Sequence, residues 1–294
     1  MKILLSLDGS PTSEVALGLA ESLCRSQGAE LLLARITDPL AAVAPGTMPS
    51  LSLRLDEHLQ EAAGAYLESL RGRLEGISVR VHNLLGSPRE TLPQVALQEK
   101  ADLIVMASHG RSGVARWLLG SVAESVLRQS PCPVLLIRPE AAPKEAQFKH
   151  ILVPIDGSPL SQEVLQRLPR LIPRAPGARI TLLRASGLSF QDHAGVIDAL
   201  SLEQFMQHLE EEIRQLSVEG FEMDYRVVDG EAADAILTLA GELGCDLVAM
   251  STHGRSGIKR FLLGSVTEKV ARRVHCPVLA FPHRSEEPQG GIGQ

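Results

Sequence analysis

Histidine, glycine and serine residues recur at one fixed spacing in two parts of the 294-residue sequence. The first block has His109-Gly110, nine further residues and then Gly120-Ser121, and the second has His253-Gly254, nine residues and Gly264-Ser265. A glycine turn that leads into a helix offers backbone N–H groups and the positive end of the helix dipole to an anion. Glycine also lets phosphate oxygens approach the backbone closely, because it has no Cβ. Both blocks are therefore candidate phosphate sites.

A purely structural interpretation of the same blocks stays open. Ser121 with Glu124, and Ser265 with Glu268, have the S-x-x-E spacing of a capping box, which stabilises a helix start without a ligand. Such a cap satisfies only part of the four free N–H groups at a helix start, so capping and phosphate binding are compatible.

Charged and polar side chains within the turns allow the same two interpretations. Arg111 and Arg255 would add positive charge next to a phosphate. His109 and His253 would either contact the phosphate or hydrogen-bond within their own turns, and we favour the structural role.

An Asp-Gly-Ser-Pro sequence follows the first apolar run of each half. Asp8 and Asp156 end these runs, and Ser-Pro is typical of a helix N-cap followed by a first-turn proline. The motif needs no ligand, but its place at the end of a strand favours contact with a nucleotide.

The two halves of the chain are copies of each other. Residues 2–11 are echoed by residues 150–159, and the blocks 106–113 and 118–122 by 250–257 and 262–266. We predict domains at residues 1–140 and 150–282, joined by a linker at 141–149 and followed by a flexible tail at 283–294.

Short apolar runs alternate with helical patterns in each copy. In the first copy the runs are 3–7, 31–36, 77–85, 103–107 and 134–137, and Ala16, Leu19, Ala20 and Leu23 mark one face of a helix between the first two. The alternation predicts an α/β fold, in which two tandem Rossmann-like domains each have an open five-stranded parallel sheet with helices on both faces. Pro169 should kink or end the first helix of the second copy.

Composition limits the partners. The net charge of −6, without a basic block, argues against nucleic acid. No apolar run approaches the roughly 20 residues of a membrane-spanning helix, so we expect a soluble, cytoplasmic protein. Cys24, Cys132, Cys245 and Cys276 have neither metal-ligand nor redox spacing, and we expect buried, reduced thiols.

These motifs resemble those of the universal stress protein family, in its tandem form and ATP-binding subtype. Relatives of that subtype carry Gly, two residues, Gly, nine residues, Gly and then Ser or Thr. The last three elements match here in both copies, whereas Ala107 and Ser251 replace the first glycine. Both replacements are small and fit a backbone with negative φ.

The resemblance implies an adenine-nucleotide α-hydrolase-like fold and one ATP in each domain, with Mg²⁺ held, if at all, by the phosphates. In the first copy the implied contacts are Leu7, Asp8, Ile36, Met106, Ala107, His109, Gly110, Arg111, Gly113, Gly120, Ser121 and Val122. In the second they are Pro154, Ile155, Asp156, Ala185, Met250, Ser251, His253, Gly254, Arg255, Gly257, Gly264, Ser265 and Val266. Adenine would lie against the apolar members, ribose or adenine against the aspartates, and the phosphates at the glycine turns.

Three functions remain open: a regulatory protein that senses or stores ATP, a slow ATPase or phosphoryl- or adenylyl-transfer enzyme, and an interaction module without nucleotide. We favour the first, because no P-loop, dinucleotide fingerprint, nucleophile elbow or zincin motif is present and no catalytic residue stands out. An unidentified protein partner would then respond to ATP. Two linked copies should also pack as an intramolecular pseudo-two-fold dimer through their final strands, and the whole chain could associate further.

Overall fold

The computed structural model describes residues 1–38, 49–108, 119–143, 146–186, 207–208, 210–211, 214–253 and 263–282. In the first half the elements are β1 (Lys2–Ser6), α1 (Pro11–Gln27), β2 (Glu30–Thr37), α3 (Pro49–Arg71), β3 (Val79–Leu85), α4 (Pro88–Gln98), β4 (Leu103–Ala107), α5 (Ser121–Gln129), β5 (Val134–Ile137) and the short 3₁₀ helix η1 (Pro139–Ala141). In the second half they are β6 (Phe148–Pro154), α6 (Pro159–Leu171), β7 (Arg174–Ala185), β8 (Glu222–Val228), α9 (Ala232–Glu242), β9 (Leu247–Ser251), α10 (Ser265–Arg273) and β10 (Val278–Phe281).

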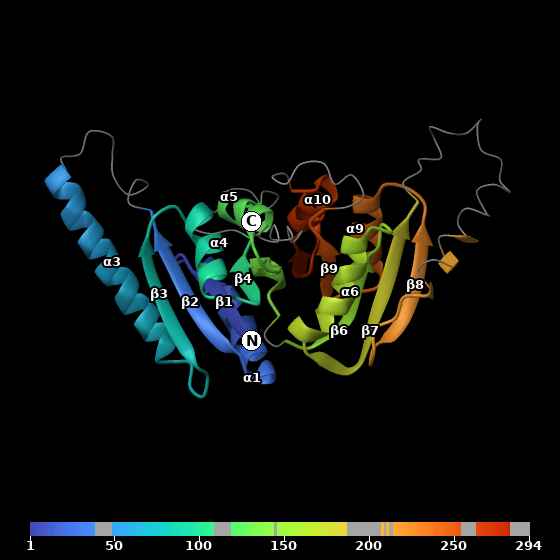
Figure 1. Cartoon of the computed structure of the whole chain (residues 1–294), viewed down its shortest axis with the longest axis horizontal. Coiled ribbons are helices and arrows are strands. Elements are labelled where there is room, and N and C mark those ends of the chain that lie inside the picture. Colours follow the sequence, from blue (N-terminus) through green and yellow to red (C-terminus); the bar gives the residue numbers. More distant parts are fainter. Residues whose placement is uncertain are drawn as a thin grey trace, which may run out of the picture.

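The strands form one ten-stranded sheet that runs through both halves (Figure 1). Its order is β3-β2-β1-β4-β5-β10-β9-β6-β7-β8, so each half has the same five-stranded arrangement. Neighbouring strands are parallel except at the centre, where β5 and β10 pair antiparallel with Leu135 opposite Leu279. The predicted α/β fold is confirmed, and the final strands of the two copies pair with each other as expected. This pairing removes one open edge from each half.

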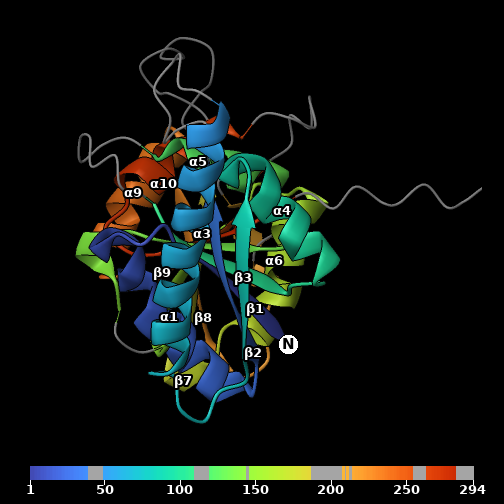
Figure 2. The ribbon, with the colours of Figure 1, turned by 90° about the vertical axis from the view of Figure 1, so that its left-hand side faces the viewer.

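Helices cover both faces of the sheet, because the strands are apolar on both sides. Alternate strand residues such as Leu5 and Leu33 pack under α1 and α3, and this core continues into the second half under α6. The intervening residues, such as Leu4 and Leu32, pack against α4 and α5. Figure 2, viewed from the β3 edge, shows α1 and α3 on one side of the sheet and α4 on the other.

The first helix of each half begins in the same way. Ser10 and Ser158 are the N-caps, and their hydroxyls accept hydrogen bonds from the N–H groups of Ser13 (3.1 Å) and Ser161 (3.2 Å). A proline follows each cap at the first helical position, where no N–H is needed. The capping predicted from Asp-Gly-Ser-Pro is confirmed in both copies.

Pro169 affects the end of α6 as predicted. The helix ends at Leu171, two residues after the proline, and has 13 residues, whereas α1 has 17. α1 ends at Gly28, whose φ of 59° gives the left-handed turn that glycine accepts readily. Residue 172 is extended instead and leads directly into β7.

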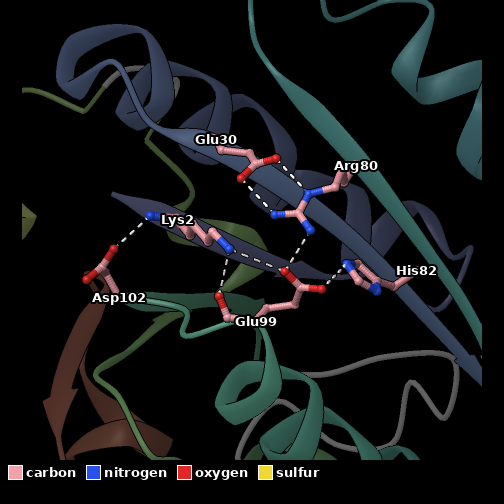
Figure 3. Close-up of polar contacts among 6 residues, drawn as sticks. All are labelled: Lys2, Glu30, Arg80, His82, Glu99 and Asp102. Atoms are coloured by element: carbon pink, nitrogen blue, oxygen red, sulfur yellow. Dashed lines mark hydrogen bonds and ion pairs between the residues drawn. The ribbon is translucent and has the colours of Figure 1, made fainter.

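A cluster of charged side chains ties together the amino ends of the strands in the first half (Figure 3). Arg80 on β3 bonds both carboxylate oxygens of Glu30 on β2, at 2.7 and 2.9 Å, and reaches Glu99 at 2.8 Å. Lys2 bonds the Glu99 carbonyl at 2.9 Å, and its backbone N–H donates to Asp102 at 2.7 Å. The hydrogen bond from Arg80 lowers the pKa of Glu30. Charge pairing therefore fixes one end of the sheet and leaves the carboxyl ends for a site.

The segment between the halves also makes specific contacts. Arg138 donates from Nη1 to the carbonyls of Arg272 (3.0 Å) and Val274 (3.1 Å) at the end of α10. The N–H of Ala146 donates to Ser22 Oγ on α1 at 2.8 Å. β6 begins at Phe148, inside the segment predicted as linker. The two halves are thus joined by more than the central strand pair.

All four cysteines lie among the described residues, are buried and form no disulfide. Burial raises the pKa of Cys24 to about 12, of Cys245 to about 11 and of Cys276 to about 12. A thiol with so high a pKa stays protonated near neutral pH and packs as a small apolar group.

Candidate functional site

A cavity of about 270 Å³ opens at the carboxyl ends of β1, β2 and β4 in the first half. β1 lies between β2 and β4, and the order of strands along the chain reverses there. Open parallel α/β sheets bind ligands at such a switch point. The volume lies near the lower end of the range of roughly 300 to 1000 Å³ for small-molecule sites. The position, which follows from topology alone, makes this cavity the candidate site.

The cavity joins an apolar part to a polar one. Its described lining residues are Ser6, Leu7, Asp8, Ser13, Ile36, Pro88, Leu92, Met106, Ala107, Ser108, Gly120, Ser121, Val122 and Ala123. Leu7, Ile36 and Met106 are at most 8% exposed and form an apolar wall. The start of α5 supplies N–H donors and Asp8 supplies a hydrogen-bond acceptor, so the cavity suits a ligand with an apolar end, donor groups near Asp8 and an anionic group at the helix start.

Asp8 is held in place by the turn that follows it. One carboxylate oxygen, Oδ1, accepts from the N–H of Ser10 at 2.9 Å and from its hydroxyl at 2.6 Å. Gly9 between them has a φ of 80°, a conformation that favours glycine. The turn expected from Asp-Gly-Ser-Pro is therefore present, and Asp8 also lines the cavity.

The start of α5 differs from the expected capping box. Gly120 is the N-cap, Ser121 is the first helical residue, and no side chain caps the helix. The capping boxes predicted for Ser121 with Glu124 and for Ser265 with Glu268 are both wrong, because Gly264 likewise caps α10 without a side-chain bond. Each serine lies one position too far along the chain to act as the cap.

The glycine caps are anchored to the sheet. Gly120 N–H donates to the Ser108 carbonyl at 2.9 Å, and Gly264 N–H donates to the Thr252 carbonyl at 3.0 Å. The first intrahelical bond of α5 is made by Glu124, whose N–H donates to Gly120 at 2.9 Å. The N–H groups of the three preceding residues have no intrahelical acceptor, so they can receive an anion.

The structure brings together eight of the residues predicted for the first site. They are Leu7, Asp8, Ile36, Met106, Ala107, Gly120, Ser121 and Val122. His109, Gly110, Arg111 and Gly113 lie outside the described residues, as do Gly254, Arg255 and Gly257 in the second half.

The second half repeats this arrangement with different side chains. Pro154 ends β6 and is followed by Ile155 and Asp156. Ala185 ends β7, and Met250 and Ser251 end β9, so these residues lie at the ends of three adjacent strands. Gly264, Ser265 and Val266 form the start of α10. Asp156 Oδ1 accepts from Ser158 N–H at 2.9 Å and from its hydroxyl at 2.6 Å, as Asp8 does with Ser10.

His253 makes a bond within its own turn. Its Nδ1 lies 2.9 Å from Thr252 Oγ1, which agrees with the structural role favoured from the sequence. The other ring nitrogen is buried and has no hydrogen-bond partner in the structure described here.

Six lining residues are not predicted by the sequence motifs. Ser6, Ser108 and Ala123 are neighbours of predicted residues, so a wider window around each motif would have included them. Ser13 and the α4 residues Pro88 and Leu92 enter the site only through the folding of their helices, and no motif marks them.

Within the described ranges, no group of three or more His, Cys, Asp or Glu side chains is placed to hold a metal ion. None of the helices in these ranges is long and apolar enough to cross a bilayer.

The sequence and the fold match those of a known family. The sequence profile of the Universal stress protein family matches residues 1–138 and again 147–282, and the chain therefore belongs to this family as a tandem member.

Individual relatives agree with this assignment. A universal stress protein of Mycobacterium tuberculosis is 30% identical over 214 residues, covering 69% of this chain and 68% of the relative. One from Synechocystis is 25% identical and covers 95% of this chain and 99% of its own. The crystal structure of a universal stress protein from Archaeoglobus fulgidus covers 97% of this chain and 98% of its own with a TM-score of 0.72 and 23% identity, which supports the fold alone.

Proposed function

We propose that this chain is an ATP-binding regulatory protein of the stress response, with one nucleotide site in each domain. The observation that carries the proposal is the cavity at the switch point of the first domain. There an apolar wall meets the start of α5, which has no side-chain cap. Adenine would lie against the wall formed by Leu7, Ile36 and Met106, and the phosphates would bind the N–H groups at the start of α5. The domains are taken as residues 1–140 and 150–282.

The chemistry of these groups supports binding more than catalysis. The start of α5 offers hydrogen-bond donors and a positive dipole, which stabilise a triphosphate without acting on it. Mg²⁺, where it takes part, would be held by the phosphates. Occupancy would then change the contacts that the chain makes with a protein partner, in the cytoplasm.

Calorimetric titration of nucleotide-free protein with ATP and Mg²⁺ tests the proposal. We expect saturable binding that GTP does not reproduce with equal affinity, since the apolar wall must fit one base. Asp8→Asn should weaken binding, because the carboxylate would accept hydrogen bonds from ribose or adenine, whereas asparagine keeps one oxygen for the Ser10 turn and replaces the other with an NH₂ donor. Arg80→Ala, at the opposite end of the sheet, is the matched control and should bind as the wild type does.

Two outcomes would overturn the proposal. Absence of binding at millimolar ATP would leave an interaction module built on this fold. Phosphate release in the usual enzymatic range of roughly 1 to 1000 per second would instead indicate an enzyme.

A further inference from the structure

The third residue of the helix that follows the glycine turn differs between the two sites. This residue is Ala123 in α5 and Thr267 in α10, since both helices have nine residues and begin at equivalent serines. Both side chains are 2% exposed. Ala123 lines the cavity of the first domain.

Thr267 ties its helix to the sheet instead. Its hydroxyl donates at 3.1 Å to the carbonyl of Ser251, which is the last residue of β9. A Cβ built on Gly264 would lie 3.7 Å from this hydroxyl, so the oxygen stands beside the N-cap glycine. The same Cβ would lie 2.6 Å from the Thr252 carbonyl, so the helix start is already packed tightly against the end of β9. In the second domain the Thr267 side chain thus lies between helix and strand, whereas in the first domain the smaller Ala123 lines the cavity.

At the apolar wall, the larger side chain belongs to the first domain instead. Ile36, which is 8% exposed and lines the first cavity, corresponds to Ala185 at the end of β7. The first domain therefore combines a large apolar side chain at the wall with a small residue at the helix start. The second domain has the reverse combination, with less apolar contact for a base and less room at the helix.

We propose that the two ATP sites are unequal, that the first domain holds the tighter one, and that Ala123 and Thr267 set much of the difference. This inference rests on the proposed function. A threonine at this position reduces the space that a nucleotide needs next to the helix start and fixes the helix against the strand. The second domain then binds ATP weakly and serves mainly as the structural partner of the first.

Exchange of the two residues tests the inference. In calorimetric titrations of the full chain with ATP and Mg²⁺, Ala123→Thr should weaken the tighter site by about tenfold, the equivalent of one unfavourable packing change. Thr267→Ala should strengthen the weaker site by several-fold. Each residue is native at the equivalent position of the other domain, and thermal melting will verify that both variants fold.

The site affected must also be located. Cross-linking with a photoreactive ATP analogue followed by peptide mapping should label the first domain at lower concentrations than the second in the wild type. In the double variant Ala123→Thr, Thr267→Ala this preference should shrink or reverse.

The outcomes separate this inference from the proposed function. Two equal sites in the wild type, or an unchanged tighter site in Ala123→Thr, would overturn the inference and leave ATP binding intact. Preferential labelling of the second domain would do the same. No binding to any variant would instead refute the proposed function.

Discussion

The first helix of each domain begins alike and ends differently. α1 and α6 share a serine cap, a first-turn proline and an aspartate held by the cap. α1 then continues for 17 residues to a left-handed glycine, whereas α6 stops after 13. The shared part is the turn at the end of the first strand, which lies at the candidate site. The end that lies away from the site has diverged without loss of the fold.

The amino ends of the strands show a second contrast. Glu30 pairs with Arg80 across β2 and β3, and at the equivalent place in the other domain Arg179 on β7 pairs with Glu222 on β8 at 3.2 Å. Lys2 lies opposite Glu30 and its counterpart His150 lies opposite Arg179, so Arg179 takes the place of Glu30 and the ion pair has the opposite orientation in the second domain. The sheet needs complementary charges here, and either order provides them.

The largest effect is expected from moving the proline between the first helices. Glu21 in α1 occupies the position of Pro169 in α6, counted from the serine caps. Glu21→Pro should lower the free energy of unfolding by about 3 kcal/mol, because α1 continues beyond this point and would lose a backbone hydrogen bond. Pro169→Ala should change it by no more than about 1 kcal/mol, since α6 already ends there. Urea unfolding measures both, and equal effects would show that the helix ends are not the source of the difference.

A smaller effect is expected at the helix start of the second site. Gly264→Ala places a Cβ 2.6 Å from the Thr252 carbonyl and should destabilise the protein by about 2 kcal/mol. The control is Gly241→Ala in α9, where a Cβ meets nothing within 4 Å and should be neutral or stabilising. Thermal unfolding compares the two. A Gly264→Ala protein as stable as the wild type would mean that α10 moves freely relative to β9.

Loss of the hydrogen bonds that Arg138 makes to the second domain should lower the stability less. Arg138→Ala removes the donor to the Arg272 and Val274 carbonyls and should lower the stability by about 1.5 kcal/mol, a typical value for hydrogen bonds to a charged group. Differential scanning calorimetry should also show a broader transition as the domains uncouple. Arg71→Ala removes an exposed pair with Glu68 and should have less than about 0.5 kcal/mol of effect. Identical calorimetric traces for these two variants would contradict a specific role of Arg138.

The smallest effect is expected on the pH dependence of stability. The Arg80 hydrogen bond lowers the pKa of Glu30 in the folded protein, so its contribution to stability is present above the unfolded pKa of about 4.3. That contribution is lost as the pH falls through the lowered pKa of the folded state. The wild type should therefore lose stability as the pH falls, and Arg80→Ala should lose less over the same pH range. Arg179→Ala should differ less from the wild type, because both side chains of the Arg179–Glu222 pair are about half exposed. Urea midpoints at several pH values test this, and parallel curves for the two variants would refute it.

Much of the fold was predictable from periodicity and repetition. The five apolar runs of the first half became its five strands. Two of them keep the expected limits, and the others shift by at most two residues, as for the strand expected at 77–85 and observed at Val79–Leu85. The capping boxes were not predictable, because S-x-x-E does not reveal whether the serine or the preceding glycine takes the extended N-cap conformation. That choice depends on the bond from Gly120 to the Ser108 carbonyl, which joins residues 12 positions apart.

The sequence by itself determined the duplication, the alternation of strands and helices, and the turns at Asp8 and Asp156, because these depend on local patterns and on residues close together in the chain. Tertiary structure alone decided that α4 contributes Pro88 and Leu92 to the cavity and that Thr267 bonds the end of β9 where Ala123 leaves space. Such contacts join segments distant in the chain, and their energies depend on packing geometry that no local pattern encodes.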